Sequence, residues 1–179
     1  MNDEHAGRVG SAMGEYQGPL IRYAARITLD VERAADAVQE TFLRLWSARE
    51  PPGLDHLAQW LFRVCRNVAL DIRRKEHRMS ALDETHVQAR PSSDPGPAAS
   101  AEKREALAHA LRALSTLPDN QQEVVRLKFQ NDFSYRQIAG ITGLSVSNVG
   151  FLIHTAIKKI RQQLGLAGSS VAQPEGAAQ

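Results

Sequence analysis

The feature that most constrains this chain is the segment RPSSDPGPAASA, Arg90 to Ala101. Its prolines, serines and glycine leave no apolar period, so no helix is expected to run through it. On both sides, apolar residues recur at three- and four-residue steps, which is the spacing of amphipathic helices. The sequence therefore predicts an all-α protein of two small helical domains, residues 1–80 and 102–166, joined by a flexible linker at 81–101. Residues 167–179 have little to bury and are expected to form a disordered tail.

An alternative is that both poor segments are loops within one domain. Loops of this length without apolar residues are uncommon in compact domains, so two domains are favoured.

The charge of the chain does not by itself indicate a ligand. Lysine and arginine number 22 and aspartate and glutamate 20, a formal net charge of +2, so any nucleic-acid binding depends on where the cations lie.

The single cysteine, Cys65, excludes an internal disulfide and fits a reducing compartment. No stretch has the pattern of a signal peptide or the length of a membrane span. We therefore expect a cytoplasmic protein without membrane insertion.

The first block reads as three helices, of which the second and third are informative. In the second, Asp30 is a candidate N-cap, and one stripe is expected to be buried: Ala34, Val38, Phe42 and Leu45. Polar residues point away from that stripe: Asp36, Gln39, Glu40 and Arg44. This helix thus has one face for the core and another for a partner.

The third helix, from about residue 57 to 77, has an apolar side and a basic side. The apolar side holds Leu57, Trp60, Leu61, Val64, Val68 and Ile72, and the basic side holds Arg63, Arg66, Asn67, Arg73, Arg74 and His77. Most charged stripes are solvated surfaces. This one carries almost no acids, and Asn67 offers an amide that can pair with a base edge. Trp60 and Phe62 are candidates for stacking on unpaired bases, although Trp60 falls on the core side.

The second block predicts a helix-turn-helix. An amphipathic helix carries Leu107, Leu111 and Leu114, and a second helix follows with Asp119 as its expected N-cap. In YRQIAGITGLSVSNV, Ala139, Gly143 and Val149 then have the spacing of this motif. The small residue permits close approach of two helices, the glycine permits the turn, and the valine closes the core between them.

Two stretches of the first block, DAVQETFLRLW (Asp36 to Trp46) and WLFRVCRNVALDIRRK (Trp60 to Lys75), resemble one bacterial family. They are similar to the second conserved region of RNA polymerase sigma factors of the extracytoplasmic-function (ECF) type. The stretch LPDNQQEVVRLKFQNDFSYRQIAGITGLSVSNV (Leu117 to Val149) resembles the fourth region. The resemblance implies a transcription initiation factor that binds core RNA polymerase and directs it to promoter DNA. It implies no catalytic activity and no cofactor.

The resemblance also assigns roles to residues of the first block. It places core polymerase binding on Asp36, Gln39, Glu40 and Arg44. It places contacts with the promoter −10 element on Arg63, Arg66, Asn67, Arg73 and Arg74. The loop at about residues 47–55 corresponds to the segment that captures a flipped-out base. Here it is short, proline-rich and without an aromatic residue, a departure from the family that leaves its base unspecified.

The helix-turn-helix corresponds to the part that binds the −35 element, and here the chain departs further. Relatives commonly carry cations where this chain has Gly150 and Thr155. The expected DNA-binding residues are Arg136, Ser145, Ser147, Asn148, Phe151, His154, Thr155, Lys158 and Arg161. Early polar residues would reach base edges, Phe151 or Thr155 a thymine methyl, and the late cations phosphates. We expect weak, shape-led or thymine-rich recognition.

Three other functions fit the sequence less well. A sigma-like mimic would occupy an anti-sigma factor without initiating transcription, but it would leave the basic third helix without a role. A plain helix-turn-helix repressor would leave the face from Asp36 to Glu40 unexplained. An enzyme is disfavoured, because the histidines are scattered and no metal-ligand spacing, phosphate loop or nucleophile motif is present. An anti-sigma factor remains a candidate partner, and a buried, inert Cys65 is expected.

Overall fold

The computed structural model describes residues 3–48, 50, 52–80 and 101–165. Within these ranges every regular element is a helix, which confirms the all-α class. The helices are α1 (Asp3–Thr28), α2 (Val31–Ser47), α3 (Leu54–Ser80), α4 (Ala101–Ser115), α5 (Asp119–Phe129), α6 (Tyr135–Thr142) and α7 (Val146–Gln163). The expected tail, and the expected linker apart from Ala101 at the start of α4, lie outside the described residues.

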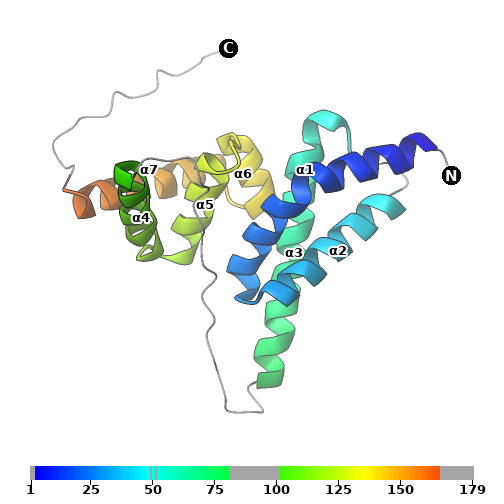
Figure 1. The fold of residues 1–179 in the computed structure, drawn as a ribbon, viewed down its shortest axis with the longest axis horizontal. Helices are drawn as coiled ribbons and strands as arrows, with labels where there is room; N and C mark the ends of the chain where they lie inside the picture. Colours follow the sequence, from blue (N-terminus) through cyan, green and yellow to red (C-terminus); the bar gives the residue numbers. More distant parts are fainter. Residues whose placement is uncertain (1–2, 49, 51, 81–100, 166–179) are drawn as a thin grey trace.

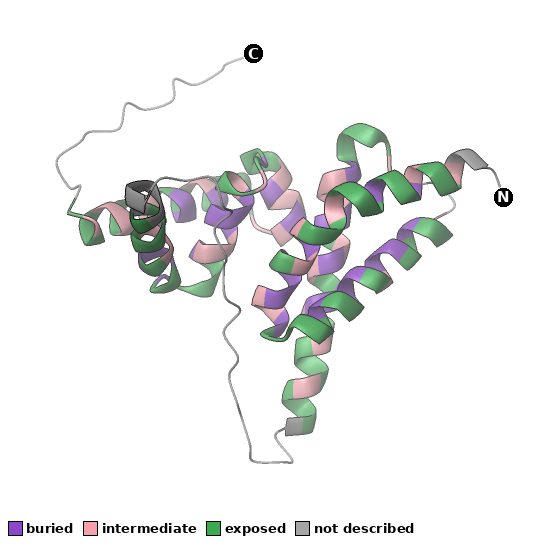
Figure 2. Ribbon diagram, viewed as in Figure 1, coloured by how far each residue is buried: buried purple, intermediate pink, exposed green. Residues whose placement is uncertain are grey.

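Helices α1, α2 and α3 pack on one another as the first unit (Figure 1). Asp30 caps α2 as predicted, since its carboxylate accepts the backbone N–H of Arg33 at 2.9 Å. The predicted stripe of α2 is buried, from Ala34 to Leu45, against α1 and α3. The last turns of α3 extend beyond the other helices, and most of their residues are exposed (Figure 2).

Helices α6 and α7 form the predicted helix-turn-helix and meet at a bend of 105°. Ser134 and Gln137 close a capping box at the start of α6. Gly143 ends α6 with φ of 78°, a left-handed conformation that glycine adopts without steric cost. Val149 is fully buried between the helices, as the motif requires.

The expected cap of α5 was wrong. Pro118 occupies the cap position, and Asp119 lies in the first turn without a side-chain capping hydrogen bond. The carbonyl of Pro118 accepts the backbone N–H groups of Gln121 and Gln122, so the proline already begins the helix. The carboxylate of Asp119 still lies near the positive end of the helix.

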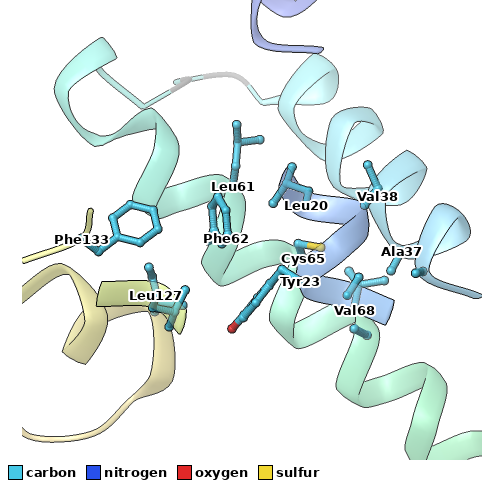
Figure 3. Packing of buried hydrophobic residues seen from close by; sticks show 14 of the residues in the cluster. Leu20, Tyr23, Ala37, Val38, Leu61, Phe62, Cys65, Val68, Leu127 and Phe133 are labelled. Carbon is cyan, nitrogen blue, oxygen red and sulfur yellow. The ribbon is translucent and has the colours of Figure 1, made fainter. Parts of the chain in front are cut away.

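The two predicted units share one hydrophobic core, because α6 packs against α3. At the contact, the ring of Phe62 lies between Tyr23 of α1 and Phe133 before α6 (Figure 3). Its centroid is 5.2 Å from that of Tyr23 and 5.0 Å from that of Phe133. Phe62 is 1% exposed, so the expectation that it stacks on bases was wrong for this arrangement. Its apolar surface is used to join the two halves.

Candidate nucleic-acid and protein interfaces

The outward face of α2 carries the four residues expected to bind a protein partner. Asp36, Gln39 and Arg44 are exposed and Glu40 is half-buried. Arg44 donates from Nε to Oε1 of Glu40 at 2.8 Å, which holds both side chains along the helix surface. Such an exposed pair contributes little stability, so the face is arranged for contact more than for folding.

Two apolar side chains beside this face were missed by the sequence reasoning. Leu43 is 53% exposed and Trp46 is 38% exposed. Together with Met13 and Ile21 of α1, they line a groove of about 480 Å³ between α1 and α2. The available signal was that Leu43 and Trp46 lie off the buried stripe. Large apolar residues outside the core often mark a protein contact.

Four of the five α3 residues predicted to contact the −10 element are exposed: Arg63, Asn67, Arg73 and Arg74. One exposed acid, Asp71, lies among them and accepts a hydrogen bond from Nη1 of Arg74 at 3.2 Å. Since both partners are largely solvated, this pair is weak and leaves the arginine available. The cations near the end of α3 are therefore presented on the part of the helix that projects from the molecule.

Arg66, the fifth position, is held by the other half of the protein. Its Nε and Nη2 atoms donate to the two carboxylate oxygens of Glu123 in α5, at 2.7 and 3.2 Å. The hydroxyl of Tyr23 donates to the same carboxylate at 2.7 Å. Burial alone would lower the pKa of Arg66, but its hydrogen bonds and charge interaction with Glu123 outweigh this and raise it. Burial and then Glu123 raise the pKa of Tyr23 well above its usual value.

Helix α7, the expected recognition helix of the helix-turn-helix, is exposed at its first turns. Ser147, Asn148, Phe151 and His154 are exposed, and Phe151 reaches 66%. The Oγ atom of Ser145 accepts the backbone N–H of Asn148 at 3.2 Å, so its first role is to cap α7. Lys158 and, on α6, Arg136 are exposed, whereas Thr155 and Arg161 are half-buried.

Gly150 lies beside the ring of Tyr135. A Cβ atom placed on Gly150 would be 3.6 Å from that ring, an ordinary van der Waals distance. The glycine is therefore not required by packing, and its effect is to leave the second turn of α7 without a long side chain.

Cys65 is buried, as predicted. It is 0% exposed, and burial raises its pKa to about 12 against a smaller lowering by Thr41. Within the described ranges, no three histidine, cysteine or acidic residues gather where a metal ion could bind.

Comparison with known proteins identifies both halves of the chain. Residues 13–79 match the family model for sigma-70 region 2, and residues 108–160 match the one for sigma-70, region 4. The chain is 33% identical over 158 residues to the ECF RNA polymerase sigma factor SigL of Mycobacterium tuberculosis, covering 85% of this chain and 88% of that protein. The chain belongs to the ECF family of RNA polymerase sigma factors.

Further comparisons agree in sequence and in fold. The ECF sigma factor EcfG of Rhodopseudomonas palustris is 30% identical over 161 residues, 88% of this chain and 86% of EcfG. The sigma factor RpoE of Bartonella quintana, solved with the anti-sigma factor NepR, superposes with a TM-score of 0.68 at 22% identity, covering 88% and 96% of the two chains. CnrH, solved with the cytosolic domain of CnrY, superposes with a TM-score of 0.57 at 24% identity, covering 90% of this chain and 89% of CnrH.

Family membership determines the general activity. This sigma factor directs RNA polymerase to promoters as a non-enzymatic initiation factor. The region 2 match contains every residue predicted on α2 and α3, and the region 4 match contains every residue predicted for the −35 element except Arg161. No single helix in the described part of the chain is long and apolar enough to cross a membrane. Helices α6 and α7 pass that test only as a bent pair.

Proposed function

We propose that residues 1–80 of this sigma factor bind core polymerase and open the −10 element, while residues 102–166 bind the −35 element. Core polymerase is contacted by Asp36, Gln39, Glu40 and Arg44. The −10 element is contacted by Arg63, Arg66, Asn67, Arg73 and Arg74. Both events take place in the cytoplasm, where a sigma factor meets polymerase and chromosome.

One observation carries this proposal: adjacent helices of one unit expose chemically different faces. The face of α2 combines carboxylates and amides with the neighbouring apolar side chains Leu43 and Trp46, as a protein interface does. The exposed face of α3 is cationic with an amide at Asn67, which suits phosphates and base edges. Two partners can therefore bind at once.

The proposal includes a rearrangement on activation. Glu123 holds Arg66 in the arrangement described here, so full −10 binding requires the α3–α5 ion pair to break. A partly buried arginine–carboxylate pair competes directly with a DNA phosphate for the same guanidinium group. Polymerase binding to both halves would supply the free energy to separate them.

Regulation by an anti-sigma factor is also proposed, on fold likeness to the sigma factor RpoE solved with the anti-sigma factor NepR. Affinity purification of the tagged chain from its host, with and without added core polymerase, tests it. A protein that binds the free chain and is displaced by polymerase supports the regulator. If polymerase subunits alone are recovered under both conditions, the regulator is contradicted.

The two interfaces are tested by reversing their charges separately. Asp36→Arg with Glu40→Arg should abolish capture of core polymerase. Arg73→Glu with Arg74→Glu should leave capture intact and abolish promoter opening, measured by permanganate reactivity of unpaired thymines. Arg112→Glu, at an exposed position on α4 outside both faces, is the matched control. If the α2 variant captured polymerase normally, the core-binding assignment would fail.

A further inference from the structure

A cavity of about 280 Å³ lies between the two halves, bounded by α1, α3 and α5. Four arginines line it, Arg26, Arg66, Arg73 and Arg126, against two acids, Asp119 and Glu123, so its lining has a net charge of +2. One of the acids, Glu123, is already engaged by Arg66 and Tyr23. The remaining arginines have no ion-pair partner among the described residues. The cavity is therefore strongly positive.

Arg126 is the unusual member of this group. Its residue is only 6% exposed, and its Nε and Nη1 atoms are buried without a hydrogen-bond partner among the described residues. Nη2 makes one long contact, 3.5 Å to Oε1 of Gln122. Burial, and then the nearby charge of Arg26, lower the pKa of Arg126 to about 10. A buried guanidinium group without a partner is costly, and buried polar groups are normally paired.

The roles already proposed do not account for Arg26 and Arg126. Neither lies on the basic face of α3, on α2 or on the recognition helix. Both line the cavity, and both also line a second, smaller cavity that includes Arg22. Two neighbouring guanidinium groups repel each other unless an anion lies between them. Their donor geometry matches the oxygens of a phosphate group.

We propose that this cavity binds a small phosphate-bearing molecule, with a phosphate group held between Arg26 and Arg126. Ile27 and Leu70 also line the cavity and offer an apolar wall for an organic part of the ligand. A volume of about 280 Å³ lies at the lower end of small-molecule sites, so the cavity can hold the phosphate end of such a molecule but not a DNA duplex or a protein helix.

Such a ligand would connect the two halves, because Arg26 belongs to α1 and Arg126 to α5. An anion that binds only when both are in place stabilises the closed arrangement through its differential affinity. Arg66 then stays on Glu123 and Arg73 faces the ligand, so the −10 surface is reduced. This regulatory consequence rests on the proposed function, whereas binding itself does not.

Binding is tested on the full chain by isothermal titration calorimetry with inorganic pyrophosphate and with ATP, and with sulfate for comparison. Arg26→Gln and Arg126→Gln should each weaken binding about tenfold or more, since each removes charged hydrogen bonds. Arg112→Gln should bind like the wild type. Because Arg126→Gln buries a polar amide, Arg126→Met is a second variant that keeps the packing. It should unfold at the wild-type temperature or higher, yet bind as weakly.

The proposal is overturned if neither pyrophosphate nor ATP binds below about 1 mM, the weak end of ordinary affinities. It is also overturned if binding survives in both Arg26→Gln and Arg126→Met. A third arm uses a single-stranded thymidine oligonucleotide. If the oligonucleotide binds with the same dependence on Arg26 and Arg126 while the small phosphates do not, the anion is a nucleic-acid backbone and the small-molecule assignment fails.

Small-angle scattering with saturating ligand tests the consequence separately. An unchanged or smaller radius of gyration supports closure, and an increase contradicts it. Neither experiment requires transcription, so failure of the anion site and failure of the polymerase assignments can be told apart.

Discussion

The two helices proposed to contact DNA, α3 and α7, differ in the side chains that they present and in whether those side chains are free. The basic face of α3 relies on charge, and its central arginine, Arg66, is bound by Glu123 of the other half. The first turns of α7 have no cation, and Phe151 is 66% exposed there. The proposed −10 surface is thus rich in charge but partly bound within the protein, whereas the proposed −35 surface is exposed but has few charges.

This difference suggests that α3 provides most of the affinity for DNA and that α7 sets the position of the protein on the promoter. Arginines on phosphates provide affinity that depends on salt and little on sequence. Exposed hydroxyl, amide and aromatic groups near base edges add a small discrimination between sites. We expect most of the promoter-binding free energy to come from α3 after Arg66 is released, with α7 setting the position.

The largest effect is expected from removing the charge of α3. Arg73→Glu with Arg74→Glu replaces two phosphate contacts by repulsion and should lower promoter binding by the polymerase complex about a hundredfold at 0.1 M salt. Electrophoretic mobility shifts of the reconstituted complex measure this. Reversing two cations of α7 in the same way, Lys158→Glu with Arg161→Glu, should lower promoter binding less. Equal losses of promoter binding in the α3 and α7 variants would contradict the proposed difference between the two helices.

The next largest effect is expected from weakening the ion pair between Arg66 and Glu123, which joins the two halves. Glu123→Gln leaves an amide that holds Arg66 less strongly, and should lower the free energy of unfolding by about 1–3 kcal/mol for this partly buried pair. The radius of gyration should rise, and single-stranded −10 DNA should bind the free protein more tightly. Glu105→Gln, which removes an exposed carboxylate on α4 outside the basic face of α3, should change none of these three quantities. A Glu123→Gln protein as compact and stable as the wild type would contradict the claim that this ion pair holds the two halves together.

Phe151→Ala should weaken −35 recognition by about threefold to tenfold, the loss of one apolar contact to a thymine methyl. Phe129→Ala is the matched control, because Phe129 is 59% exposed on α5, outside the recognition helix. Footprints on promoters that differ only at −35 thymines distinguish the Phe151→Ala protein from the Phe129→Ala control. Unchanged promoter choice in Phe151→Ala would remove Phe151 from the interface.

The smallest effect is a gain. Gly150→Arg adds a cation to the second turn of α7, and the space beside Tyr135 accepts a Cβ without strain. The substitution should raise −35 affinity by about threefold and steepen its dependence on salt. Gly150→Ala supplies the helix propensity without the charge and separates the two causes. A gain shared by both variants would mean that helix stability, and not the missing cation, limits recognition.

Much of this arrangement was predictable because it depends on local spacing. The buried stripe of α2, its Asp30 cap and the left-handed Gly143 each follow from neighbours within a few residues. The contacts of Phe62 and Arg66 do not follow from neighbouring residues. Arg66 and Glu123 are 57 positions apart, and periodicity shows which side of a helix is apolar or basic without showing what packs against it. A basic stripe looks the same in sequence whether it binds DNA or a carboxylate of its own chain.

The central claim is that α2 binds polymerase while the arginines of α3 bind the promoter. Transcription from genomic fragments by core polymerase reconstituted with each charge-reversed protein tests it most directly. Asp36→Arg with Glu40→Arg should lose both polymerase capture and transcripts. Arg73→Glu with Arg74→Glu should keep capture and lose transcripts. Wild-type transcription from both variants would contradict the assignment of these two faces.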